Sequence, residues 1–380
     1  MLHLFADGPR DAHCPDCSAW LEKGVRAGVP GRRADAGFQA GGQPALAVSR
    51  RRVGILPPVL ARPGVVTFES MRTLELPEIR RALDYGAAIG CMREALMAYS
   101  RGECDTPMPM HLDIAPVAGE VHVKSAYRRG GRHFALKIAG SFPLNAARGL
   151  PGSAGMMLLS SAGTGEPVAF LADNGWLTDV RTAAVAAMVA RELGRSDTTL
   201  GIIGTGTQAR LQARLHAEVL PLETIYVWGR TPARAAQCRG EIAALVPNAM
   251  VIAAASPAGL ARRSRLIVTA TSAREPLLSA GDLQPDTLVS AVGSDSPGKQ
   301  ELDPEIVRRA DLLLVDSRRQ CEKLGELQHA PEEARRAIEI GALCAGGPPA
   351  PAGITVCDYT GLGVEDLYIA EYCWERSASL

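Results

Sequence analysis

A glycine motif between an apolar strand and a helix carries the clearest chemistry of the chain. The apolar run 200–203 leads into Gly204-Thr205-Gly206-Thr207-Gln208-Ala209, and a helical stretch follows. In such a motif the first glycine permits a tight turn, the second lets the backbone approach a pyrophosphate, and Ala209 allows close helix–strand packing. The free N–H groups at the start of the helix then face the phosphates. We predict that residues 204–209 bind a dinucleotide.

The end of the next strand indicates which dinucleotide is bound. Residues 224–228 form this strand, which ends in Trp228-Gly229-Arg230-Thr231. NAD sites usually have an acidic residue here, which binds the ribose 2′-hydroxyl. An arginine instead suits a 2′-phosphate and can stack on adenine, although it is also an ordinary residue for an exposed loop. We predict that residues 229–231 contact the cofactor, with NADP favoured over NAD.

Three charged residues are candidates for contact with a substrate. Lys137 ends an otherwise apolar strand, where a buried amine has a lowered pKa and can exchange a proton with a nitrogen. Arg181 is predicted in the first turn of a helix, a position that favours binding of a carboxylate. Asp295 follows the strand 288–292, at the sheet edge where ligands of parallel sheets bind. Taken singly, each has a plainer reading as an edge lysine, a helix-end arginine or a turn aspartate.

The elements that must position these residues follow from periodicity. Apolar spacing predicts one or two helices between residues 71 and 99. Short alternating runs predict two hairpins, which turn at 129–132 and at 163–165. A helix is predicted to begin at Thr178 or Asp179 and to end before Gly194. From about 196 to 315 strands alternate with helices, the order that produces a parallel sheet.

These elements predict an α/β protein with a Rossmann dinucleotide-binding domain and a strand-rich α+β domain built from both chain ends. The Rossmann domain is assigned to 195–315, and the substrate-binding and dimerisation domain to 65–194 with 316–380. Residues 1–64 lack periodicity and are rich in Gly, Pro, Ala and Arg. We read them as a disordered extension or an over-extended translation start rather than an Arg-rich transit peptide.

Composition excludes several classes of protein. Lys plus Arg and Asp plus Glu both number 41, and aromatic residues are 4% of the chain, which argues against a nucleic-acid partner. No apolar run approaches the ~20 residues that span a bilayer. Nine scattered cysteines indicate a reducing cytoplasm. Cys14 and Cys17 form a lone CxxC, and no second pair completes a zinc site, so no metal is predicted.

Four sequence blocks resemble the ornithine cyclodeaminase/mu-crystallin family, in order and in spacing, from about Met71 onward. They are residues 134–137, 178–184, 201–208 and 291–299, and the segment 358–366 resembles the family's last turn on the nicotinamide side. The resemblance implies a homodimer that transfers hydride between nicotinamide C4 and the α-carbon of an amino or imino acid. It also implies that Arg181 binds the α-carboxylate, that Lys137 and Asp295 manage protons, and that Gly293 and Gly361 lie beside the cofactor.

The chain departs from ornithine cyclodeaminases in two places. Those enzymes have an arginine about two dozen residues before the Lys137 position, but residues 103–127 here contain none. They also have an acidic residue thirteen positions before that lysine, where this chain has Lys124. A lysine repels a substrate ammonium and attracts a second carboxylate, unless it is merely an exposed strand residue. The surrounding run resembles the ectoine-utilisation and iminosuccinate reductase subgroup, so we predict a dicarboxylic imino acid bound by Lys124 and Arg181.

Three functions remain open from the sequence. The first is an NAD(P)-dependent imino-acid reductase or amino-acid dehydrogenase acting on a small, iminosuccinate-like substrate. The second is an ornithine cyclodeaminase, which converts ornithine to proline and ammonia without net redox change. The third is a mu-crystallin-like protein that binds NADPH and a small ligand.

Overall fold

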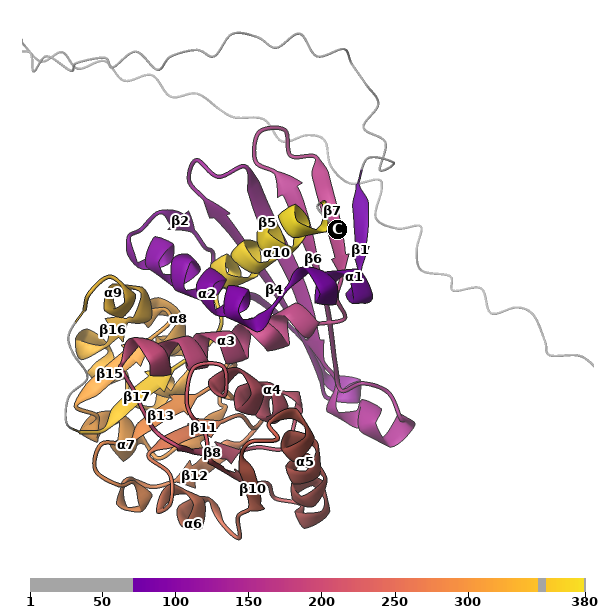
Figure 1. Ribbon diagram of the computed structural model, residues 1–380. Helices are drawn as coiled ribbons and strands as arrows, with labels where there is room; N and C mark the ends of the chain where they lie inside the picture. The colour runs from indigo at the N-terminus through magenta and orange to yellow at the C-terminus, as the bar shows by residue number, and fades with distance from the viewer. Residues whose placement is uncertain (1–70, 348–352, 379–380) are drawn as a thin grey trace, which may run out of the picture. The chain divides into compact units, whose positions relative to one another are not determined.

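The computed structural model of the chain describes residues 71–347 and 353–378. The expectations for residues 1–64, including Cys14 and Cys17, lie outside the described residues. Two large sheets with their helices make up the described part (Figure 1). Within these ranges no helix is both long and apolar enough to cross a membrane.

The first sheet has seven strands and contains both predicted hairpins. Its order is β1-β7-β6-β5-β4-β2, and β3 also pairs with β4. All pairs are antiparallel except β1 with β7. The strands are β1 (Arg72–Glu75), β2 (Cys104–Asp105), β3 (Met110–Ile114), β4 (Gly119–Arg128), β5 (His133–Ser141), β6 (Ser153–Ser161) and β7 (Pro167–Ala172).

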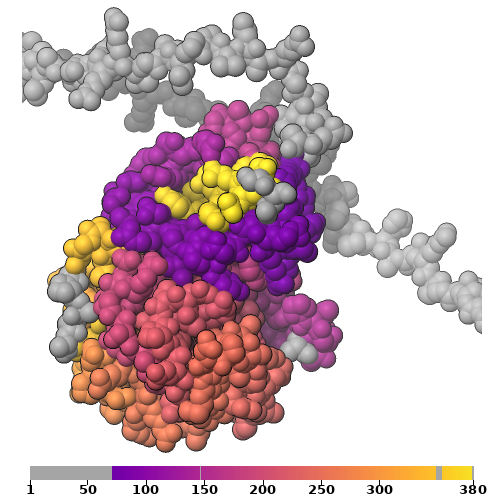
Figure 2. All heavy atoms as spheres, viewed as in Figure 1, coloured from indigo at the N-terminus to yellow at the C-terminus, as the bar shows by residue number. Residues whose placement is uncertain are grey.

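Four helices pack on or beside this sheet. Helix α10 lies against β4, β5 and α2, so the last helix of the chain joins the first described segments (Figure 1). Figure 2 shows the yellow atoms of α10 bordered by the indigo atoms of the early part of the chain, which includes α2. The helices are α1 (Leu76–Ala82), α2 (Tyr85–Ser100), α3 (Trp176–Glu192) and α10 (Gly363–Ser377).

Helix α3 begins earlier than predicted. Gly175 occupies the N-cap with a φ of 84°, a left-handed conformation that glycine adopts without strain. The Asp173 carboxylate then accepts a hydrogen bond from the Leu177 N–H at 2.7 Å. The helix therefore starts at Trp176, and Arg181 lies in its second turn, not its first.

The second sheet has eight strands, and every pair in it is parallel. Its order, β10-β9-β8-β11-β13-β17-β15-β16, places β8 and β11 at the reversal of strand order that is typical of dinucleotide-binding folds. The predicted Rossmann architecture is confirmed. The strands are β8 (Thr199–Ile203), β9 (Thr224–Trp228), β10 (Met250–Ala253), β11 (Leu266–Thr269), β13 (Leu288–Ala291), β15 (Leu312–Val315), β16 (Ile338–Glu339) and β17 (Thr355–Asp358).

The C-terminal segment divides between the two sheets, which differs from the sequence prediction for 316–380. Strand β17 is fully buried and pairs with both β13 and β15, because its four residues complete the centre of the parallel sheet. Helix α10 returns to the first sheet, and α9 packs against α2.

The remaining elements surround the parallel sheet or connect strands. Strands β12 (Arg274–Leu278) and β14 (Gln300–Leu302) form a separate parallel pair. The helices are α4 (Thr207–His216), α5 (Pro232–Leu245), α6 (Pro257–Ala261), α7 (Pro304–Arg309), α8 (Arg318–Leu324) and α9 (Ile340–Cys344). The short 3-10 helices are η2 (Ala115–Val117), η3 (Pro143–Arg148), η4 (Ala280–Asp282), η5 (Glu326–His329) and η6 (Pro331–Arg336).

Candidate active site and cofactor cleft

A cavity of about 390 Å³ opens at the carboxyl ends of β8, β9 and β11. Six of the predicted cofactor residues line it: Gly204, Thr205, Gly206, Gly229, Arg230 and Thr231. Gly204 has a φ of 134°, and a Cβ on it would collide with the Ala270 carbonyl. Gly206 is the N-cap of α4, and a Cβ there would meet no protein atom. Glycine at position 204 therefore permits the tight turn, and glycine at position 206 leaves open space at the N-terminus of α4.

Other residues of the motif support the loop or reach a different cavity. The Arg210 guanidinium donates to the carbonyls of Thr205 and Gly206 at 3.0 and 2.8 Å, which fixes the loop. Thr207 is the first residue of α4, and Ala209 is fully buried beneath it. The Gln208 amide donates to the Asp179 carbonyl at 3.0 Å, so this side chain faces α3 and not the cavity above the loop.

A buried glutamate that the sequence analysis missed holds the neighbouring loops. The Glu301 carboxylate accepts hydrogen bonds from Thr269 Oγ1, from the N–H and hydroxyl of Thr271, and from the Gly293 N–H, all at 2.7 to 2.8 Å. It thereby joins the carboxyl ends of β11 and β13 beside the cavity. Nothing in the local sequence distinguishes Glu301 from an ordinary strand residue, because its partners lie 8 to 32 residues away.

A second cavity, of about 170 Å³, lies between α3, α4 and the loop that precedes α10. Arg181, Gln208, Asp295 and Gly361 all line it. This cavity therefore brings together residues from three of the four sequence blocks and from the segment 358–366. Gln208 stands two residues after the glycine turn. It is the place where a substrate and the reactive end of a dinucleotide can meet.

Lys137 is buried beside this cavity and paired with an aspartate from the far end of the chain. Its ammonium donates to Asp366 Oδ1 at 2.9 Å and lies 2.8 Å from Oδ2. The residue is 1% exposed. Burial and the nearby Arg181 guanidinium lower the pKa of Lys137 to about 7, although Asp366 opposes them. An amine with such a pKa exchanges a proton readily near neutral pH.

Lys124 faces Lys137 across β4 and β5 but has its own partners. Its ammonium donates to the carbonyls of Thr360 and Gly361, both at 2.8 Å. The side chain is buried, so the reading of an exposed strand lysine is wrong. Burial lowers the pKa of Lys124. Lys124 therefore anchors the loop before α10 and has one N–H left for another acceptor.

The Arg181 guanidinium is oriented by the first turn of α10. Its Nε donates to Asp366 at 3.2 Å, and its Nη1 donates to Glu365 at 3.0 Å. Among the described residues Nη2 has no hydrogen-bond partner. Gly361 has a φ of 73°, and a Cβ there would collide with the guanidinium. The Gly361 N–H donates to the Asp316 carboxylate at 2.6 Å, which fixes this close approach.

Asp295 also lines the cavity, and Lys299 holds its carboxylate in place. The Lys299 ammonium is 2.7 Å from Asp295 Oδ1 and 3.2 Å from Glu120 Oε1. Burial raises the pKa of Asp295, but Lys299, Lys124 and His122 together lower it to about 2. Asp295 is therefore anionic at neutral pH and can only accept hydrogen bonds there.

The chain is similar to known proteins over most of its length. Residues 70–379 match the ornithine cyclodeaminase/mu-crystallin family. An uncharacterized cyclodeaminase of Sinorhizobium fredii is 38% identical over 319 residues, covering 81% of this chain and 96% of the relative. The chain belongs to the ornithine cyclodeaminase/mu-crystallin family. The resemblance inferred from the sequence blocks is thereby confirmed.

Two solved structures of the family bear on chemistry. The Δ1-pyrroline-2-carboxylate reductase of Thermococcus litoralis, in complex with NADH and L-proline, is 25% identical with a TM-score of 0.75, covering 81% of this chain and 98% of that one. The iminosuccinate reductase of Paracoccus denitrificans, in complex with NAD+, is 28% identical with a TM-score of 0.72, covering 81% and 97%. Both of these relatives are named as reductases, and both structures contain a nicotinamide dinucleotide.

The acidic residues of the site were missed although they lie within a family block. Glu365 and Asp366 occupy the first turn of α10, where acidic residues commonly complement the helix dipole. Sequence reasoning therefore gives them a routine role. Both are 1% exposed and hold cations, which is a much rarer arrangement.

Proposed function

We propose that the protein is an NAD(P)-dependent oxidoreductase that reduces the C=N bond of a small imino acid and, in reverse, oxidises the amino acid. The observation that carries this proposal is the shared cavity of Arg181, Gln208 and Asp295, with the Lys137–Asp366 pair buried beside it. Gln208 joins that cavity to the dinucleotide loop. A titratable amine and a carboxylate-binding guanidinium therefore stand next to the cofactor cleft.

The residues divide the work of such a reaction. The cofactor supplies hydride to the imine carbon, or accepts it from the amino acid. Arg181 binds the substrate carboxylate through Nη2, because Glu365 and Asp366 hold its other nitrogens. The Lys137 ammonium delivers one proton to the nitrogen, which balances the transferred hydride, and Asp366 orients it. Asp295 accepts a hydrogen bond from the substrate N–H.

Absorbance at 340 nm tests this proposal. Purified protein is supplied with pyruvate or oxaloacetate plus ammonia, or with a cyclic imino acid, together with NADH or NADPH. Net cofactor oxidation that is lost in Arg181→Lys supports the proposal. Proline and ammonia formed from ornithine without net absorbance change would establish an ornithine cyclodeaminase instead; the S. fredii relative is named as a cyclodeaminase. Tight NADPH binding without turnover of any imine would indicate a binding protein.

We infer further that the natural substrate carries a second carboxylate, as iminosuccinate does. The support is the remaining N–H of Lys124 and the similarity to an iminosuccinate reductase. The acidic cavity lining (Asp179, Asp295, Asp316 and Glu365) argues against a dianion unless Lys124 takes part. In Lys124→Gln, kcat/KM should fall about tenfold more for a dicarboxylic than for a neutral imino acid. An equal loss for both substrates would mean that Lys124 anchors the loop before α10 and does not bind a second carboxylate.

We infer that NADP is preferred. The cavity above the glycine loop is lined by Arg230 and Arg234, and no carboxylate is among its lining residues within the described ranges. A ribose 2′-hydroxyl therefore lacks its usual acceptor, while a 2′-phosphate meets two guanidinium groups. The two solved relatives described above hold NADH and NAD+. Under this proposal the protein therefore prefers a different dinucleotide from the one bound in those structures.

We also propose that the protein is a homodimer formed through the outer face of the first sheet. The register places Met110, Val123, Ile138 and Met156 in one row across β3, β4, β5 and β6. Met110, Ile138 and Met156 are 42 to 53% exposed, and Leu112 and Ile114 extend the row along β3. A contiguous apolar face of this kind marks an interface. A second copy offers a matching surface under twofold symmetry.

A further inference from the structure

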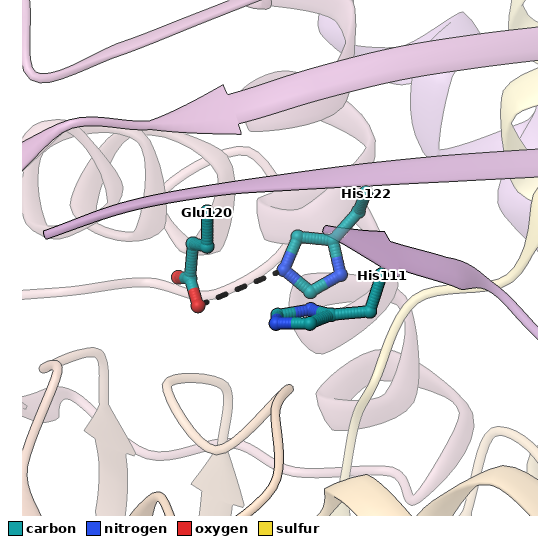
Figure 3. Close-up of side chains that lie close together, drawn as sticks. All are labelled: His111, Glu120 and His122. Atoms are coloured by element: carbon teal, nitrogen blue, oxygen red, sulfur yellow. Dashed lines mark ion pairs between the residues drawn. The ribbon is translucent and has the colours of Figure 1, made fainter. Parts of the chain in front are cut away.

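Two histidines and a glutamate converge on the inner face of the first sheet. His111 on β3 stands directly opposite His122 on β4, and their ring centroids are 4.6 Å apart. Glu120 lies two residues before His122, so strand alternation puts its side chain on the same face. Figure 3 shows the three side chains pointing toward one another from the two adjacent strands. One ligand atom from each residue lies within 4.8 Å of the others.

The hydrogen bond of His111 to Asp113 leaves its other ring nitrogen without a hydrogen-bond partner among the described residues. Its Nε2 lies 3.0 Å from the Asp113 carboxylate, whereas its Nδ1 is buried and has no hydrogen-bond partner among the described residues. A carboxylate that accepts from one nitrogen fixes the tautomer and leaves a lone pair on the other. Metal-ligating histidines are commonly oriented in this way, and a buried unpaired nitrogen is otherwise costly.

The glutamate also has an oxygen available. Lys299 lies 3.2 Å from Oε1, while Oε2 is 3.9 Å from His122 Nε2 (Figure 3). Ligand atoms of a tetrahedral zinc site are roughly 3.4 Å apart, given metal–ligand bonds of about 2.1 Å. Small side-chain rotations therefore suffice to close the cluster on an ion. The Lys299 ammonium partly neutralises the Glu120 carboxylate, so the two imidazoles must supply most of the affinity for an ion. This disfavours ions that bind through oxygen alone.

We propose that His111, Glu120 and His122 form a binding site for a divalent transition metal such as Zn²⁺ or Co²⁺, with water at the open position. Two imidazoles and one carboxylate are a donor set that such ions prefer and that Mg²⁺ does not. None of these three residues lines the dinucleotide or the substrate cavity, although Lys299 connects Glu120 to Asp295 of the substrate cavity. It needs neither the proposed reaction nor a bound cofactor.

Metal uptake by the full chain tests the proposal. Chelator-treated protein is dialysed against Zn²⁺ or Co²⁺, and bound metal is measured by mass spectrometry. One equivalent per chain should be lost in His111→Gln and in His122→Gln. His133→Gln is a matched control, because His133 also pairs with a carboxylate (Glu371, 2.8 Å) yet belongs to no three-ligand group among the described residues. It should keep the equivalent, and Mg²⁺ should not bind.

Two further measurements separate the site from other causes. The Cys14→Ser/Cys17→Ser variant should retain the histidine-dependent equivalent, since a cysteine pair also binds zinc. X-ray absorption at the zinc edge of this Cys14→Ser/Cys17→Ser protein should show two imidazoles and oxygen ligands without sulfur, a result that needs no histidine variant to fold. Absence of stoichiometric uptake, sulfur coordination, or full uptake in the His111→Gln/His122→Gln double variant would overturn the proposal.

Discussion

Lys137 on β5 and Asp366 in the first turn of α10 are 229 residues apart in sequence, yet their charged groups lie 2.8 to 2.9 Å apart in a buried pair. Arg181 shares the same carboxylate at 3.2 Å. The aspartate thus joins the Lys137 ammonium to the Arg181 guanidinium. Because Asp366 lies on α10, this buried cluster forms only when α10 packs against β4 and β5 of the first sheet.

Replacing Lys137 by methionine should reduce kcat/KM roughly 10²- to 10⁴-fold, the range typical of a lost general acid or base. Methionine keeps the volume of the side chain and removes the proton. Dinucleotide affinity should stay unchanged, because the cofactor cavity is lined by other residues. Lys323→Met, on the exposed face of α8, is the control and should retain full activity. A Lys137→Met protein with normal turnover and a normal melting temperature would refute the assignment.

The pH dependence of the two directions should be opposite. Burial lowers the pKa of Lys137 to about 7. Imine reduction needs the ammonium form, so its kcat/KM should fall as pH rises through 7. Amine oxidation needs the free amine, so its kcat/KM should rise over the same interval. Burial also raises the pKa of Glu365 to about 7. The change of kcat/KM near pH 7 should therefore vanish in Lys137→Met and persist in Glu365→Gln. The reverse pattern would assign this pH dependence to Glu365.

A side chain at Gly206 should block the dinucleotide. A Cβ at this position meets no protein atom and projects into the cavity of about 390 Å³. Gly206→Val should weaken binding of NADH and NADPH by at least about tenfold, or ~1.4 kcal/mol, as measured by fluorescence titration. Gly240→Val is the matched control on α5, where an added side chain also meets no atom. Equal affinities in the two variants would contradict the assignment of the loop.

Arg230→Ala should weaken NADPH binding about tenfold or more and leave NADH binding nearly unchanged, since a charge-assisted hydrogen bond contributes about 1.5–3 kcal/mol. Arg239→Ala, an exposed arginine on α5, controls for the loss of surface charge. Isothermal titration with both cofactors measures the ratio. If the ratio of the two dissociation constants does not change, Arg230 plays no part in cofactor choice.

An aspartate at position 138 should separate the proposed dimer. Ile138 is 42% exposed in the middle of the apolar row, and a buried charge there has no partner in the row. Sedimentation should show a dimer for the unmodified protein and a monomer for Ile138→Asp. Leu245→Asp, at an exposed position at the end of α5, should remain dimeric. A monomeric unmodified protein would exclude the interface altogether.

Local patterns were sufficient for much of the architecture. The hairpins, the parallel sheet and the turn at Gly204 each depend on residues close together in sequence, so periodicity and glycine placement predicted them. The predicted start of α3 was two or three residues too late, because the left-handed Gly175 occupies the N-cap position where a polar residue was expected. The position of β17 was also missed, since four buried residues give no local signal of which sheet they complete.

The sequence by itself determined that a dinucleotide loop, a strand lysine and a helix arginine are present, because each is written in a short run of residues. Only the tertiary structure decided how they act. It buried Lys137 and thereby lowered its pKa, placed Glu365 and Asp366 on the cations, and turned Lys124 toward backbone carbonyls. These effects arise from desolvation and from contacts hundreds of residues apart, which no local pattern encodes.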